Sequence, residues 1–175
     1  MKLNYTPKNK GLTLIEALIW FAIFAAVVAG VFALYSSSRN ASNASTVNKE
    51  LSTIFSQTEQ LFASEDTADL DNTIALQLGI FPNSLKVNGT TVNNVFGGTV
   101  VIEGVTPSGF TVTYTNIPSG EVCSNIVRAQ KAVGWDTGLA VPYGSAYKIK
   151  DVAEACGNNG GAAKTLEFVR LNANV

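Results

Sequence analysis

The most prominent pattern in the chain is an uncharged, mostly apolar run of nineteen residues, Ala17–Tyr35. As a helix this run would be about 28 Å long, close to the thickness of the hydrocarbon core of a bilayer. Lys2, Lys8 and Lys10 precede it with no acidic residue among them, a bias that places the N-terminus in the cytoplasm. A cleaved signal peptide fits badly, because its apolar region is shorter and carries no acid. We therefore expect a membrane-spanning helix, with the rest of the chain exported.

After a polar stretch, the apolar positions narrow to a stripe that recurs every three or four residues, which is one face of a helix. The stripe consists of Val47, Leu51, Ile54, Phe55, Thr58, Leu61 and Phe62. No proline occurs between residues 8 and 81, so we predict a single helix from about Leu12 to Ala63. Its first half is apolar all round, whereas its second half needs a partner on one side.

The middle of the chain has the alternation and composition of β-strands. Asn88-Gly89 lies between two short extended segments and predicts a hairpin with a type I′ turn. Residues 97–105 and 109–117 are rich in β-branched and aromatic side chains and predict two antiparallel strands. Residues 164–171 predict a last strand.

Shorter helices are predicted around these strands. Residues 74–81 predict a helical turn. A helix is expected after Ser119, which we take as its N-cap, with Glu121 in its first turn and Gly134 ending it. Residues 150–156 predict another short helix that ends at Cys156. The expected fold class is α+β, with a long helix, three to five antiparallel strands and one or two further helices.

Composition and charge restrict the function. The chain is 46% hydrophobic and 14% charged, and it contains no histidine, the commonest general base and metal ligand. Beyond residue 11 the formal charge is 9 − 13 = −4, which does not resemble a nucleic-acid-binding surface. No nucleophile motif is present. We therefore expect no enzyme, no cofactor and no nucleic-acid partner.

The two cysteines, Cys123 and Cys156, both lie in the part expected to be exported. Without a CxxC motif or histidine they do not indicate a zinc site, and we expect a disulfide. Two buried free thiols are the alternative. The acids Asp66, Asp69 and Asp71 permit a calcium site, but the EF-hand spacing is absent, and a solvated loop that caps a helix is the favoured interpretation.

One acid, Glu16, interrupts the apolar N-terminal region, although an ionised carboxylate in hydrocarbon costs several kcal/mol. The sequence Lys10-Gly11-Leu12-Thr13-Leu14-Ile15-Glu16, followed by a helix-length apolar run, resembles the class III signal of type IV prepilins. The resemblance implies cleavage between Gly11 and Leu12 by a membrane prepilin peptidase, followed by N-methylation of Leu12. It also implies that Glu16 pairs with the N-terminal amine of a neighbouring subunit and sets the register of the filament. Thr13 is assigned with Glu16 to this assembly and register site, and it is expected to form local hydrogen bonds in the first turn.

Three segments of the chain are similar to type IVb pilins, in particular the bundle-forming and conjugative thin-pilus group. These segments are the N-terminal residues 11–38, Asn94-Val95-Phe96-Gly97-Gly98, and residues 110–123. The resemblance implies a leader at 1–11, a transmembrane and filament-core helix at 12–35, and an exported globular domain at 36–175. It further implies that Cys123 and Cys156 bridge a region on the fibre surface, and residues 136–150 and 157–164 are the expected contact surface.

The function implied is that of the major subunit of a type IVb pilus, used for adhesion, aggregation or conjugative contact. Expected partners are other copies of the chain, the prepilin peptidase and methyltransferase, the pilus assembly platform, and the inner membrane before assembly. The expected location is the bacterial inner membrane, with a cytoplasmic N-terminus, and then the extracellular pilus. Two alternatives remain. One is a minor pilin or type II secretion pseudopilin that primes or caps assembly. The other is a membrane-tethered adhesin or enzyme that never polymerises.

Overall fold

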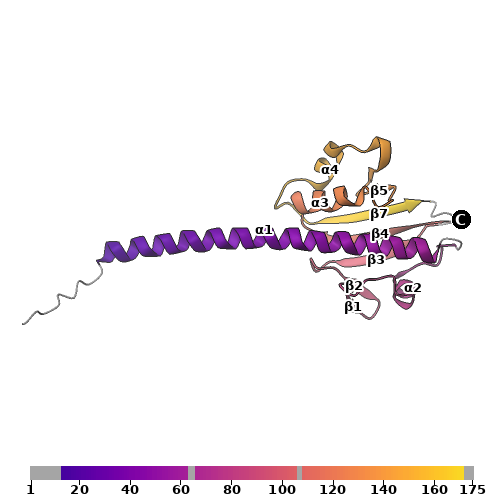
Figure 1. Ribbon diagram of the computed structural model, residues 1–175, viewed down its shortest axis with the longest axis horizontal. Helices are drawn as coiled ribbons and strands as arrows, with labels where there is room; N and C mark the ends of the chain where they lie inside the picture. Colours follow the sequence, from indigo (N-terminus) through magenta and orange to yellow (C-terminus); the bar gives the residue numbers. More distant parts are fainter. Residues whose placement is uncertain (1–12, 63–65, 106–107, 172–175) are drawn as a thin grey trace, which may run out of the picture. The chain divides into compact units, whose positions relative to one another are not determined.

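The computed structural model describes residues 13–62, 66–105 and 108–171 (Figure 1). The predicted cleavage residues, Gly11 and Leu12, lie outside this part of the chain. The chain divides into two compact units, one ending at Arg39 and the other beginning at Asn40. The first helix, α1 (Leu14–Leu61), contributes residues to both units.

Helix α1 agrees with the long helix that the sequence predicts, whose expected ends at residues 12 and 63 fall outside the described residues. In the second unit α1 buries one face. The buried residues of α1 are Ala44, Val47, Glu50, Leu51, Ile54, Phe55 and Thr58. Leu61 departs from the prediction, since it is 43% exposed, whereas Phe62 just beyond the helix is buried.

The second unit contains an antiparallel sheet of seven strands in the order β1-β2-β3-β4-β7-β5-β6, counted over the described residues. The strands are β1 (Lys86–Asn88), β2 (Thr91–Asn93), β3 (Thr99–Gly104), β4 (Gly109–Ile117), β5 (Thr137–Gly138), β6 (Val141–Pro142) and β7 (Lys164–Leu171). The three long strands are the ones that the sequence predicts. The expected total of three to five strands was too low, because β5 and β6 are two residues each and show no alternation.

One face of the central strands forms part of the hydrophobic core. In β4, Val112 is flanked across the ladder by Ile102 of β3 and Phe168 of β7, and all three are fully buried. Helix α1 lies against this face, where the ring of Phe55 is 5.9 Å from that of Phe110. Burial of these large side chains, at about 25 cal/mol per Å² of apolar surface, is the main stabilising contribution.

The β1–β2 hairpin is present, but its turn differs from the prediction. Asn88 pairs with Thr91, so the two-residue turn consists of Gly89 and Thr90. Gly89 has a φ of +63°, whereas Thr90 is not among the residues with positive φ. A positive φ at only the first central position is the pattern of a type II′ turn, and the predicted type I′ turn is wrong.

Helix α2 (Asn72–Gln77) begins two residues before the predicted turn at 74–81. The reason is a cap, because an Asp71 carboxylate oxygen accepts a hydrogen bond from the backbone N–H of Ile74 at 2.8 Å. This agrees with the interpretation of the acidic segment as a loop that caps a helix.

Helices α3 (Glu121–Gln130) and α4 (Ile149–Cys156) lie on the β7–β5 side of the sheet (Figure 1), with the short 3₁₀ helix η1 (Gly144–Ala146) between them in sequence. The predicted N-cap of α3 is wrong. Gly120 occupies that position, and the Ser119 hydroxyl instead donates to the Asn158 carbonyl oxygen at 2.9 Å. A partner 39 residues away could not be anticipated from local sequence.

Candidate assembly site

The first half of α1 exposes large apolar side chains from Leu14 to Tyr35. The exposed fraction is 80% for Leu14, 64% for Trp20 and 69% for Phe32. Within the described residues, α1 is the one helix long and apolar enough to span a membrane, and its most apolar stretch buries nothing inside the chain. A soluble monomer does not tolerate an apolar surface of this extent, so these side chains need lipid or other copies as their partner.

Glu16 lies in the first turn of α1, where the positive end of the helix dipole favours a carboxylate. Its backbone N–H donates a hydrogen bond to the Thr13 hydroxyl oxygen at 3.3 Å. Thr13 therefore has the local hydrogen-bonding role that the sequence predicts. Among the described residues, the Glu16 carboxylate itself has no ion pair.

The geometry at Thr13 and Glu16 reveals a second role that the sequence interpretation missed. Thr-x-x-Glu is the pattern of a capping box, in which the threonine hydroxyl satisfies the N–H of the third helical residue. The structure shows the threonine half of this pattern, in which the Glu16 backbone N–H donates to the Thr13 hydroxyl oxygen. The spacing of Thr13 and Glu16 was the available signal.

The predicted disulfide joins Cys123 of α3 to Cys156 of α4, with the Cα atoms 5.6 Å apart. Hydrogen bonds reinforce the same junction. Gly120 N–H donates to the Cys156 carbonyl oxygen at 3.1 Å, and Glu121 N–H donates to the Asn159 side-chain oxygen at 2.7 Å. A Cβ at Gly120, where φ is +74°, would lie 2.1 Å from that Asn159 oxygen, so this close approach requires glycine.

A tyrosine side chain links two segments of the region between the cysteines by a hydrogen bond. The Tyr143 hydroxyl donates to the Val127 carbonyl oxygen at 2.6 Å, which ties the β6–η1 loop to α3. Burial raises the pKa of Tyr143, so its hydroxyl keeps the proton that it donates. At the surface, the Lys131 ammonium lies 4.4 Å from the centre of the Tyr147 ring.

The Asn94 side chain holds the Asn94-Val95-Phe96-Gly97-Gly98 segment in place by hydrogen bonds. Its side-chain oxygen accepts from the backbone N–H groups of Phe96 and Gly98, and its amide donates to the Thr115 carbonyl oxygen at 2.9 Å. A Cβ at Gly98 would lie 2.0 Å from the same Thr115 oxygen. The motif is a tight turn packed against β4, and its role here is structural.

Glu50 is an acid that the sequence stripe left unexplained. It is 2% exposed on the buried face of α1. The Ser84 hydroxyl donates to one of its oxygens at 2.7 Å, and the Tyr114 hydroxyl lies 3.5 Å from the other. Desolvation raises the pKa of Glu50, and the Ser84 hydrogen bond opposes this shift in part.

The acids considered for calcium do not converge. Asp71 caps α2, and an Asp66 side-chain oxygen accepts from the Ala68 N–H at 2.9 Å. Over residues 13–62, 66–105 and 108–171, no group of three or more acidic or cysteine side chains is placed to hold a metal ion.

A long helix with an uncovered apolar half, an antiparallel sheet on its other half and a disulfide-bridged region define a type IV pilin-like fold. The chain matches the family model described as "PilS N terminal" over residues 41–171, more than half of its length. It belongs to this type IV pilin-related family, whose members are structural subunits. The matched segment begins after the apolar run, so the family assignment and the Gly11–Glu16 motif are independent observations. No curated protein and no solved structure matches the chain.

Proposed function

We propose that this protein is the major subunit of a type IVb pilus, of the bundle-forming and conjugative thin-pilus group. It polymerises through the first half of α1 into a surface filament for adhesion, aggregation or conjugative contact. The observation that carries this proposal is the uncovered apolar surface of residues 14–35, which has an acid in its first turn. The family match and the disulfide-bridged fold support it.

In this proposal the chain has two successive environments. It first spans the inner membrane with its N-terminus in the cytoplasm, where the prepilin peptidase cuts between Gly11 and Leu12. The methyltransferase then modifies the new amine of Leu12, and the assembly platform transfers the subunit into the fibre. There the apolar surface packs against other copies, and non-directional apolar packing supplies most of the cohesion.

Glu16 gives this packing its register. A carboxylate that meets the Leu12 amine of a neighbouring copy loses an unfavourable exposure to lipid, whereas an unmatched partner of a buried pair costs about 3–5 kcal/mol. The axial offset at which the pair forms is therefore the preferred one. This account uses the charge of Glu16, which is separable from its place in the capping box.

Two substitutions distinguish the charge from the cap. Glu16→Gln removes the charge but keeps the polar side chain, and Glu16→Ala removes both, whereas either variant keeps the backbone N–H that donates to the Thr13 hydroxyl oxygen. We expect both variants to be processed at Gly11 and to lose fibres, because the register needs the charge. Normal piliation of Glu16→Gln would remove the pairing role and leave only the cap.

The function as a whole is tested by shearing cells and analysing the supernatant on a gel and by mass spectrometry. An abundant chain that begins at Leu12 and carries one added methyl group supports a major pilin. A faint or absent band with correct processing would indicate a minor pilin or pseudopilin that primes or caps assembly. An exported chain that still begins at Met1 would contradict the prepilin pathway altogether.

A further inference from the structure

Basic residues of the second unit are concentrated between the end of α3 and the start of α4. Four of the nine basic residues beyond Gly11 lie between positions 128 and 150, namely Arg128, Lys131, Lys148 and Lys150. The one acid in that interval, Asp136, lies 3.5 Å from the Arg170 guanidinium. Asp151 and Glu154 follow directly in α4, and Glu154 lies 3.5 Å from the Lys150 ammonium. Among the described residues, Arg128, Lys131 and Lys148 are the bases of this interval without a salt bridge. By contrast, residues 66–71 contain three acids and no base.

The basic residues border an open groove of about 600 Å³ beside α3 and the start of α4. Its lining consists of Asn125, Arg128, Ala129, Lys131, Tyr147 and Ile149, with no acid among them. Arg128 lies in the last turn of α3, and Lys131 is the C-cap residue with helical dihedral angles, so the two are three residues apart on one face. In the described part of the chain, neither forms a salt bridge. The groove therefore presents two cations without a carboxylate partner among the described residues: the Arg128 guanidinium, a fork suited to carboxylates, and the Lys131 ammonium, which lies over the Tyr147 ring.

The acidic loop, which we define as residues 66–71, is held in a fixed shape. The Thr67 hydroxyl oxygen accepts from the Gly109 N–H at 3.0 Å, and Gly104 N–H donates to the Leu70 carbonyl oxygen at 2.8 Å. Asp69 is exposed and, among the described residues, takes part in no salt bridge. A partner that binds this loop has little ordering entropy to overcome.

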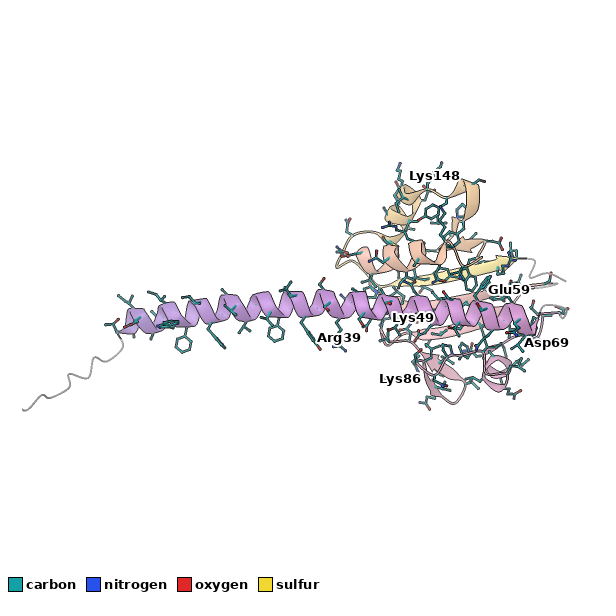
Figure 2. The ribbon with its side chains drawn as sticks, viewed as in Figure 1. Arg39, Lys49, Glu59, Asp69, Lys86 and Lys148 are labelled. Carbon is teal, nitrogen blue, oxygen red and sulfur yellow. A yellow bond between two sulfur atoms is a disulfide. The ribbon has the colours of Figure 1, made fainter. Side chains whose placement is uncertain are left out.

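The groove and the acidic loop lie on different sides of the exported unit. The loop leads into Asn72, whose side chain bonds to the backbone of Val100 and Ile102 along the outer edge of β3. The groove lies beyond β7, on the side of α3 and α4. Figure 2 shows Lys148 and Asp69 in these two places. Within one copy the two charged surfaces therefore do not meet.

We propose that the groove of one copy binds the acidic loop of a neighbouring copy in the filament, with Arg128 and Lys131 facing Asp69. This rests on the proposed function, because it needs polymerisation, and it names the contact between exported units. A surface and its complement on different sides of a molecule form a heterologous contact, which produces an open helical array rather than a closed dimer. The pairing adds direction and salt dependence to the cohesion that the apolar helices supply.

Carbodiimide coupling of sheared wild-type filaments tests the contact directly, because it joins only carboxylates and amines that touch. Filaments are assembled from a mixture of isotopically light and heavy chains, so that a link between copies is recognised by its mixed mass. We expect a mixed-mass peptide that joins Lys131 to Asp69. Mixed-mass links elsewhere, with none between the groove lysines and residues 66–71, would overturn the proposal.

Charge reversal provides the second test. We expect Arg128→Glu to lower the yield of sheared filaments at least tenfold and Asp69→Arg combined with it to restore most of that yield. Lys86→Glu is the matched control, since it makes the same change of charge on an exposed residue of β1 and should assemble like wild type. Correct folding of each variant is checked by formation of the Cys123–Cys156 disulfide.

The outcomes separate this inference from the proposed function. A wild-type chain that is processed but forms no filament contradicts both. A wild type and Arg128→Glu that assemble equally well contradict only the contact. Loss of filaments in Arg128→Glu without restoration by Asp69→Arg indicates another anionic partner in the groove and also overturns the contact proposed here.

Discussion

Removing the disulfide is the perturbation whose magnitude follows most directly from the structure. Cys123 and Cys156 are 33 residues apart in sequence, and on the chain-entropy model a loop of that length corresponds to about 3.7 kcal/mol of stability. Both residues are fully buried, so alanine is the appropriate replacement, because a buried serine hydroxyl without a partner adds its own cost of about 1–3 kcal/mol.

The expected shift is large enough to measure. At about 2–4 °C per kcal/mol for a chain of this size, the double variant Cys123→Ala/Cys156→Ala should melt about 7–15 °C below the wild type. The measurement is thermal unfolding of the full chain in detergent micelles, followed by near-ultraviolet circular dichroism of the buried Trp135. Cys123→Ala alone should show nearly the same shift, because one substitution already removes the cross-link.

The native arrangement of α3 and α4 should survive at 25 °C, because hydrogen bonds hold the same junction. The Gly120–Cys156 and Glu121–Asn159 contacts do not involve the sulfur atoms. A shift below about 3 °C would show that the unfolded chain is not restrained as the loop model assumes. A double variant that fails to fold would show that the hydrogen bonds are insufficient without the bridge.

Three further outcomes are expected. In chemical denaturation, Glu50→Gln should become more stable relative to wild type as pH rises from 4 to 7. The pKa of Glu50 is raised in the folded state, so the unfolded state ionises first and the wild type loses stability as pH rises through the folded pKa. Parallel pH profiles of the two proteins would contradict this. Arg170→Met should lower the free energy of unfolding by about 1–3 kcal/mol, since Arg170 donates to Glu59 at 2.9 Å in a half-buried setting; an unchanged denaturation midpoint would show that the pair contributes nothing. Gly98→Ala should destabilise by more than 1 kcal/mol, because its methyl group meets the Thr115 carbonyl oxygen; wild-type stability would mean that the turn moves freely.

The sequence predicted the elements whose residues repeat with a clear period. The stripe that includes Leu51 and Ile54 identified the buried face of α1, and the alternation in residues 109–117 and 164–171 identified β4 and β7. In these elements the spacing of apolar residues is set by which side chains are buried, so the element can be predicted without knowing what it packs against.

Features that depend on distant partners were not predictable. The strands β5 and β6 exist because Thr137 and Gly138 pair with β7, and their turn places Leu139 and Ala140 at positive φ without a glycine to signal it. The burial of Glu50 follows its helical position, but its hydroxyl partner Ser84 is 34 residues away. For the proposed assembly site, Glu16 and the apolar run are visible in the sequence and their role stays a prediction, whereas the groove beside α3 appears only when the chain is folded.

The complete burial of both cysteines sets an order of events for the folding of the second unit. Thiol–disulfide exchange requires that an attacking thiolate reach a sulfur atom, and the finished fold shields both. An oxidase must therefore act on the chain while α3 and α4 are still apart. Once these helices have closed, external reductants are kept from the bond, so a mature fibre would retain its bridges in surroundings that reduce accessible ones.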